Sequence, residues 1–252
     1  MLLFKGEHLL INWIVVTFLA CIVMGCVTVT EHDSVSTFDN IKAADARIVL
    51  GLSYLNADNR QKARENLELA LKFAPNYYRA LNSIAYYYQL VGEDEFADKA
   101  YKHAMWESPN NSELLNNYGA FLCRLGQYAQ ADVFFNRAIE QPSNHQIADS
   151  LENAAICSLK SGNRVDAEFY FKRCLDYDPA RYFSLIQLSK LMLEREKYDE
   201  TRVRLVEFHK KFGFQSSSLH LLIKLENKVG NKEQAQQYAL ALELNYPSST
   251  KN

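Results

Sequence analysis

Residues 78–109 read YRALNSIAYYYQLVGEDEFADKAYKHAMWESP, and the spacing of small residues in this stretch determines the fold. Ala85, Ala97, Ala104 and Pro109 each have a counterpart 34 residues away in both directions along the chain. The counterparts are Gly51, Ala63, Ala70 and Pro75 on one side, and Gly119, Ala131 and Ala138 on the other, with Pro142 one place early. A period of this length is typical of proteins built from stacked structural repeats.

The same period continues to the end of the chain after a two-residue insertion near Gln141–Asn144. The next three copies carry Ala155, Ala167, Cys174 and Pro179, then Ser189, Thr201, Phe208 and Gly213, then Ile223, Ala235, Leu242 and Pro247. The fifth copy is degenerate. The sequence therefore predicts six repeats, starting at Ala44, Tyr78, Ser112, Ala148, Tyr182 and Ser216.

The spacing predicts that each repeat consists of two antiparallel helices of about 13 residues joined by a tight turn. Small residues at the eighth and twentieth positions let the paired helices approach closely. Pro or Gly at position thirty-two ends the second helix. The turn carries glycine at the fifteenth position in four repeats: Gly92, Gly126, Gly162 and Gly230. We therefore expect an all-α fold.

This pattern resembles the tetratricopeptide repeat (TPR) family, and the resemblance covers Ala44 to about Pro247. It implies a right-handed superhelical solenoid of six TPR helix-turn-helix repeats, with the first helix of each repeat lining the concave side. A single repeat cannot bury its own apolar face, so stability comes from the stacking of neighbours.

The N-terminal residues differ from the repeats. Lys5 precedes an apolar run from Leu9 to Val23, which is shorter than a membrane-spanning helix. Val23-Met24-Gly25-Cys26 resembles the bacterial lipobox. The expected organisation is a lipoprotein signal peptide (1–25), a lipidated Cys26 with a flexible tether (26–43) and a TPR domain (44–252). A signal anchor, or a cleaved leader without lipid, is the alternative.

The residue after Cys26 is Val27 and not the Asp that resembles an inner-membrane retention signal. We therefore expect an acyl-anchored protein, palmitate included, on the periplasmic face of the outer membrane. With Cys21 and Cys26 assigned to the leader and the anchor, three cysteines remain: Cys123, Cys157 and Cys174. Their odd number argues against a disulfide framework and favours buried free thiols, although their redox state stays open.

The sequence offers no candidate for catalysis. Its six histidines are scattered, without the His-x-x-x-His or Cys-x-x-Cys spacing of a metal site and without a Gly-rich phosphate loop. A net charge of −2 gives no reason to expect nucleic acid. We therefore predict a non-enzymatic protein, without metal or cofactor, that works by binding another protein.

The binding surface is expected at positions two, five, nine and twelve of the first helices, which face the concave groove in repeats of this type. We call these positions the inner face. In repeats two to four they are Arg79, Asn82, Tyr86, Gln89, Glu113, Asn116, Ala120, Cys123, Asp149, Glu152, Ile156 and Leu159. This surface suits an extended or helical segment. Asn117 and Asn153, at position six, are expected to hydrogen-bond between helices.

The lipobox, the repeat count, the insertion after repeat three and the stretch Leu115-Asn116-Asn117-Tyr118-Gly119-Ala120-Phe121-Leu122 together resemble the pilotins of type IV pilus systems, the PilF/PilW family. The resemblance implies an adaptor, monomeric when free, that carries the secretin subunit to the outer membrane and helps it multimerise, which pilus biogenesis requires. The alternative is another periplasmic TPR lipoprotein serving cell-envelope enzymes, proteolysis or outer-membrane protein assembly.

Overall fold

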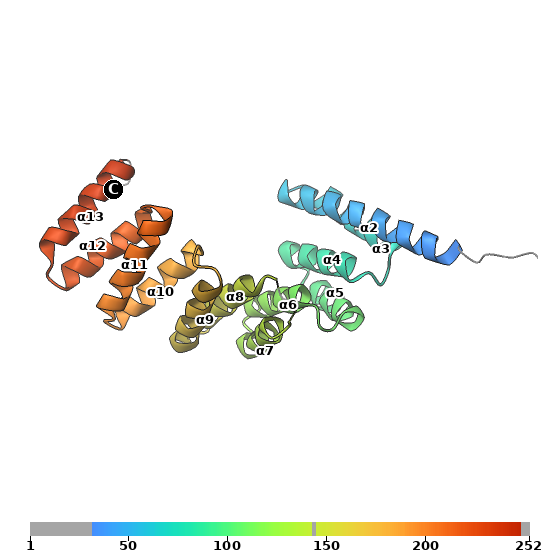
Figure 1. Cartoon of the computed structure of the whole chain (residues 1–252). Helices are drawn as coiled ribbons and strands as arrows, with labels where there is room; N and C mark the ends of the chain where they lie inside the picture. Colours follow the sequence, from blue (N-terminus) through green and yellow to red (C-terminus); the bar gives the residue numbers. More distant parts are fainter. Residues whose placement is uncertain (1–31, 143–144, 248–252) are drawn as a thin grey trace, which may run out of the picture. The chain divides into compact units, whose positions relative to one another are not determined.

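A computed structural model describes residues 32–142 and 145–247, and these residues form 12 helices and no strand (Figure 1). The helices are α2 (His32–Asn56), α3 (Arg60–Phe73), α4 (Tyr78–Val91), α5 (Asp94–Glu107), α6 (Ser112–Arg124), α7 (Tyr128–Ile139), α8 (Ile147–Lys160), α9 (Arg164–Tyr177), α10 (Tyr182–Glu194), α11 (Tyr198–Phe212), α12 (Ser216–Lys228) and α13 (Lys232–Asn245). The expected signal peptide (residues 1–25) and the expected lipidation site, Cys26, lie outside the described residues.

The chain divides into two units, residues 1–43 and 44–252, and the second is a TPR solenoid. Helices α4, α6, α10 and α12 begin at the expected residues Tyr78, Ser112, Tyr182 and Ser216, and α8 begins one residue early. Five of the predicted repeat starts are therefore confirmed to within one residue. These predictions are correct because the small residues that define the period also determine where paired helices can touch.

The expected flexible tether is wrong in its second part, because α2 begins at His32 and residues 32–43 are helical. The helix extends N-terminally because neither Gly nor Pro interrupts the sequence between residues 31 and 50. Within the first unit, the Lys42 ammonium lies 4.2 Å from the ring centroid of Phe38, one helical turn away.

Close packing within each repeat follows from the small residues. Ala63, Ala97, Ala131 and Ala167, all at the twentieth position, are completely buried. In the degenerate fifth repeat Thr201 takes this position, also fully buried, and its hydroxyl donates a 2.7 Å hydrogen bond to the Lys197 carbonyl oxygen. The degenerate copy therefore keeps the packing of the others, with its polar hydroxyl satisfied inside the helix.

The turn inside each repeat uses the left-handed backbone conformation at the fifteenth position. Gly92, Gly126, Gly162 and Gly230 have φ between 77° and 83°. The two repeats without glycine there place Asp58 and Glu196 at φ 54° and 60°. Because L-residues adopt this conformation at a cost, its appearance in all six repeats shows that the turn geometry is fixed by the packing of the two helices.

A buried carboxylate ties repeat four to repeat five. Glu168 on α9 is 5% exposed and contacts Lys172 Nζ at 3.0 Å, Arg195 Nη1 at 2.7 Å and Lys197 Nζ at 2.7 Å. Burial alone would raise the pKa of Glu168, but hydrogen bonds from Lys197, Arg195 and Lys172 outweigh it and lower the pKa to about 2. Glu168 is therefore ionised at neutral pH and holds the α10–α11 turn against α9.

A second buried carboxylate ties repeat five to repeat six. Glu226 on α12 is fully buried and accepts hydrogen bonds from Arg202 on α11, at 2.6 Å and 3.2 Å, and from Asn231 Nδ2 at 3.2 Å. The hydrogen bond to Glu226 raises the pKa of Arg202. Sequence analysis found neither carboxylate, because nothing in the repeat pattern distinguishes a buried Glu from an exposed one.

None of the twelve described helices is both long enough and apolar enough to cross a bilayer.

Candidate protein-binding surface

The first helices of successive repeats contact one another, α4 with α6, α6 with α8 and α10 with α12. Their inner-face residues therefore lie next to those of the neighbouring repeat. Side chains that are about one repeat apart in the sequence become hydrogen-bond partners in the structure. These contacts decide which inner-face groups are fixed and which are free to meet a partner.

At the N-terminal end of the TPR domain, Arg79 on α4 forms an ion pair with Asp45 on α2 at 3.0 Å. Tyr77 Oη donates a 2.9 Å hydrogen bond to the same Asp45 carboxylate. Burial is the main reason that the pKa of Tyr77 is raised, so the phenol stays protonated and keeps donating. Arg79, expected on the inner face, is thus half-exposed and held by the preceding repeat.

An amide ladder continues across repeats two to four. Asn82 Nδ2 donates to Glu113 Oε1 at 3.3 Å, and Asn117 Nδ2 donates to Asn82 Oδ1 at 3.3 Å. One repeat further, Asn153 Nδ2 donates to Asn116 Oδ1 at 3.1 Å. The expectation that Asn117 and Asn153 hydrogen-bond between helices is confirmed. Asn82 and Asn116, expected to meet a partner, are also engaged within the ladder.

Arg181, which precedes α10, binds the carboxylates of repeat four. It contacts Asp149, lies 3.7 Å from Glu152 and hydrogen-bonds Asp178 at 2.9 Å. Burial would lower the pKa of Arg181, but the hydrogen bonds with Asp149 and Asp178 raise it. Glu152 also accepts a hydrogen bond from the Ser184 hydroxyl. The acidic inner-face residues of repeat four are therefore neutralised by one arginine that sequence analysis did not single out.

Two expected inner-face residues are turned toward the interior. The Gln89 amide oxygen accepts a 3.0 Å hydrogen bond from the buried Tyr101 hydroxyl on α5. Burial raises the pKa of Tyr101, so this hydroxyl remains a donor. Cys123 is 6% exposed. Both side chains are therefore less accessible to a binding partner than an exposed, unbonded side chain on the inner face would be.

In repeats two to four, the exposed large apolar side chains at or next to the inner-face positions lie on α4. Tyr86 is 41% exposed and Leu90, one turn later, is 48% exposed. Ala120 on α6 is partly exposed. Leu90 was not among the expected site residues, because it lies at position thirteen of its repeat. The sequence could have identified Leu90, because its four-residue spacing from Tyr86 places both side chains on one face of the helix.

Cys123 on α6 and Cys157 on α8 form a disulfide, with their Cα atoms 5.8 Å apart. The expectation of free thiols is therefore wrong for these two residues and confirmed for Cys174, which is buried and unpaired. Cys174 Sγ lies 3.3 Å from Ser184 Oγ and 3.4 Å from the Ala148 carbonyl oxygen, and burial raises its pKa. An odd count had suggested no disulfide, yet it only requires one cysteine to be left over.

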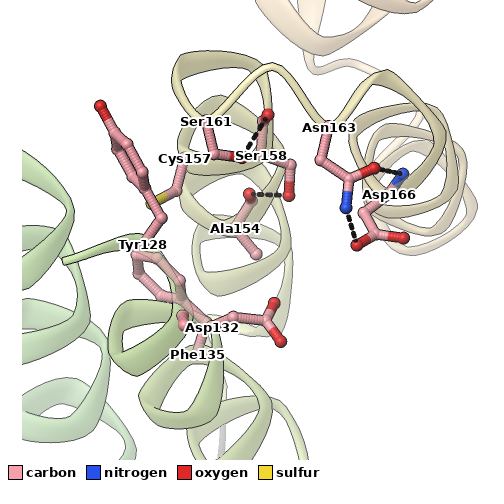
Figure 2. A pocket seen from close by; sticks show the side chains of 10 residues that line it. Tyr128, Asp132, Phe135, Ala154, Cys157, Ser158, Ser161, Asn163 and Asp166 are labelled. Carbon is pink, nitrogen blue, oxygen red and sulfur yellow. Dashed lines mark hydrogen bonds between the residues drawn. The ribbon is translucent and has the colours of Figure 1, made fainter. Parts of the chain in front are cut away.

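A cavity of about 280 Å³ lies between α7, α8 and α9, and Figure 2 shows the side chains around it. Its polar groups are already engaged within the chain. Ser158 Oγ donates to the Ala154 carbonyl at 2.9 Å, and Asn163 Oδ1 accepts from the Asp166 amide at 3.2 Å as the cap of α9 (Figure 2). Asp132 accepts a 2.7 Å hydrogen bond from Tyr170. The cavity is a gap between repeats three and four.

Within residues 32–142 and 145–247, no three His, Cys, Asp or Glu side chains come together as metal ligands would.

The similarity to known proteins agrees with the repeat pattern. Tetratricopeptide repeat sequences match residues 44–77 and 100–132. An uncharacterized protein of Haemophilus influenzae is 36% identical over 133 residues, which are 53% of this chain and 74% of that protein. The type IV pilus assembly protein PilF of Pseudomonas aeruginosa is 28% identical over 235 residues, 93% of each chain.

Two solved structures share the fold. The structure of Pseudomonas aeruginosa PilF is 28% identical, with a TM-score of 0.69, and the match covers 83% of this chain and 95% of that one. The structure of PilW, described as a widely conserved type IV pilus biogenesis factor, is 26% identical, with a TM-score of 0.66 and coverage of 82% and 95%.

Proposed function

Starting from the premise that this chain belongs to the tetratricopeptide repeat family and is homologous to PilF and PilW, we propose that it is a type IV pilus biogenesis adaptor. It binds the secretin subunit of the pilus machinery and promotes its localisation and multimerisation at the outer membrane. The observation that carries the proposal is the similarity to PilF over 93% of both chains.

The inner face supports a role in protein binding. Its polar residues are held by the preceding or following repeat, as in Asp45–Arg79 and Asn116–Asn153. Groups fixed in this way lose little conformational freedom when a partner binds. The exposed pair of Tyr86 and Leu90 supplies the kind of aromatic and aliphatic contact that commonly carries affinity in protein interfaces.

The proposal includes a lipid anchor at Cys26 and a location on the periplasmic face of the outer membrane. Two or more acyl chains would make membrane release negligible. The Cys123–Cys157 disulfide supports an oxidising compartment, since disulfides persist in the bacterial periplasm and are rare in the cytosol. The anchor and the binding surface are separable parts of the mechanism, because they lie in different units of the chain.

The test is deletion of the gene in its native host, followed by measurement of secretin multimers in outer-membrane fractions and of pili on the cell surface. We expect both to fall, and the full-length protein to restore them. A Cys26→Ala variant is expected to accumulate folded, to leave the membrane fraction and to restore multimers poorly. Normal multimers and pili in the deletion strain would overturn the proposed function, and membrane-bound Cys26→Ala would overturn the anchor.

A further inference from the structure

At the C-terminal end of the solenoid, the inner face carries lysines in place of the acidic residues of earlier repeats. Lys190, Leu193 and Glu194 on α10, together with Leu221, Lys224 and Lys228 on α12, line a cavity of about 210 Å³. Lys190 and Lys224 are at position nine of their repeats, and Leu193 is at position twelve, so the cavity opens on the inner face. We call it the C-terminal pocket. It lies between α10 and α12, which contact each other.

The lysines of this pocket have no acidic partner among the described residues. Lys190, Lys224 and Lys228 are exposed, and none makes an ion pair or side-chain hydrogen bond in the described part of the chain. The one carboxylate that lines the pocket, Glu194, is paired with Arg164. The acids of earlier repeats are matched instead, as Asp45 is by Arg79 and Asp149 by Arg181. The C-terminal pocket therefore carries a surplus of positive charge.

The pocket also has an apolar lining. Leu193 and Leu221 are 3% and 7% exposed, and they present their remaining surface to the cavity. Its volume is suited to one apolar side chain. Burial of such a side chain between two leucines would be favourable by the hydrophobic effect. A ligand that used both features would carry an apolar group flanked by negative charges.

We propose that the C-terminal pocket binds an acidic segment of the protein partner, with one Leu-like or Phe-like side chain in the cavity and neighbouring carboxylates on the lysines. Ammonium groups on flexible stems suit carboxylates presented at variable positions along a peptide. The inference rests on the proposed function, that the chain is an adaptor for a protein, and adds the chemistry of the segment recognised. The apolar lining favours a peptide over an anionic lipid surface, whose headgroups offer nothing to the leucines.

The test uses the full chain without its leader and a fluorescent peptide with the sequence Glu-Asp-Phe-Glu-Asp. Two further peptides serve as comparisons, one with Lys in place of every acid and one with Ser in place of Phe. We expect binding of the acidic Phe peptide that weakens as salt is raised. Weaker binding is expected for the Ser peptide, and none for the Lys peptide.

Charge-reversal variants locate the site. The double variant Lys190→Glu/Lys224→Glu is expected to bind the acidic peptide on the order of tenfold more weakly, because two attractive contacts become repulsive. The matched control is Lys232→Glu, a reversal on exposed α13 outside the pocket, which should bind as the wild type does. Circular dichroism of each variant verifies that the repeats remain folded.

Several outcomes would overturn the proposal: no binding of the acidic peptide to the wild type, equal binding of the Ser peptide, or equal loss in Lys232→Glu. Vesicles containing phosphatidylglycerol provide a separate arm. Vesicle binding that depends on Lys190 and Lys224, without peptide binding, would assign the pocket to lipid headgroups and reject the peptide. None of these outcomes bears on secretin multimers in the deletion strain, so the proposed function is decided separately.

Discussion

Gly119 on α6 and Phe135 on α7 lie so close that a Cβ atom on the glycine would come within 2.9 Å of two ring carbons. The same added atom would lie 3.3 Å from the Ala131 carbonyl oxygen. Phe135 is 1% exposed, so the ring is part of the core that the two helices enclose. The closest approach of the paired helices in repeat three therefore depends on the absence of a side chain at position 119.

Gly119→Ala is accordingly expected to destabilise the protein, although alanine is the better helix former by about 1 kcal/mol. Overpacking a well-filled core costs about 1–3 kcal/mol. The measurement is the free energy of unfolding in urea. Ala85→Gly, at the same position of repeat two, is the control and should lose about 1–2 kcal/mol, from helix propensity and from the loss of a buried methyl group, without overpacking. A Gly119→Ala protein more stable than the wild type would contradict the close-packing argument.

The Cys123–Cys157 disulfide joins two neighbouring repeats and should contribute measurably to stability. A disulfide closing a loop of this size typically stabilises by about 2–4 kcal/mol. We expect dithiothreitol to lower the urea midpoint of the wild type and to leave that of the Cys123→Ser/Cys157→Ser variant unchanged. Cys174→Ser keeps the bridge and should retain the sensitivity to reductant. A wild-type midpoint indifferent to dithiothreitol would show that the bridge does not form.

Glu168 should make the protein sensitive to acid. Its pKa is lowered to about 2 in the folded state, from an ordinary value of 4.5. A carboxylate with a lowered pKa stabilises the fold above its ordinary pKa, and this contribution is lost as the pH falls toward the folded value. The linkage amounts to about 3 kcal/mol, lost between about pH 5 and pH 2.

The measurement for Glu168 is the free energy of unfolding across that pH range. Glu168→Gln should be less stable at pH 7 and should show a flatter dependence on pH than the wild type. Glu140→Gln removes an exposed carboxylate and serves as the control, with the wild-type slope expected. Parallel curves for the wild type and Glu168→Gln would mean that the three cations do not act on Glu168 in solution.

Tyr86 and Asn82 should separate partner binding from folding. Tyr86 is 41% exposed, whereas Asn82 is 8% exposed and hydrogen-bonded to Glu113 and Asn117. Tyr86→Ala is expected to change stability by less than about 0.5 kcal/mol and to weaken binding of the proposed partner, the secretin subunit, about tenfold or more. Asn82→Ala should cost about 1–2 kcal/mol of stability. Wild-type affinity in Tyr86→Ala would remove α4 from the binding surface.

Sequence alone determined the number, the boundaries and the turns of the repeats. Tyr78 and Ser112 start helices where the 34-residue period placed them, and Gly92 and Gly126 form the turns. This was possible because small residues and turn glycines act over short distances. Whether two helices can touch, or the chain can reverse, is decided by the side chains at those few positions.

Only the tertiary structure decided which inner-face side chains are free and which are bonded. Asn116 meets Asn153, and Cys123 meets Cys157, although these cysteines occupy different positions, twelve and ten, of their repeats. The same is true of Arg181 with Asp149. These pairs depend on the offset and rotation between helices of different repeats. That offset is the sum of many contacts across the stack, and no single residue type in the sequence encodes it.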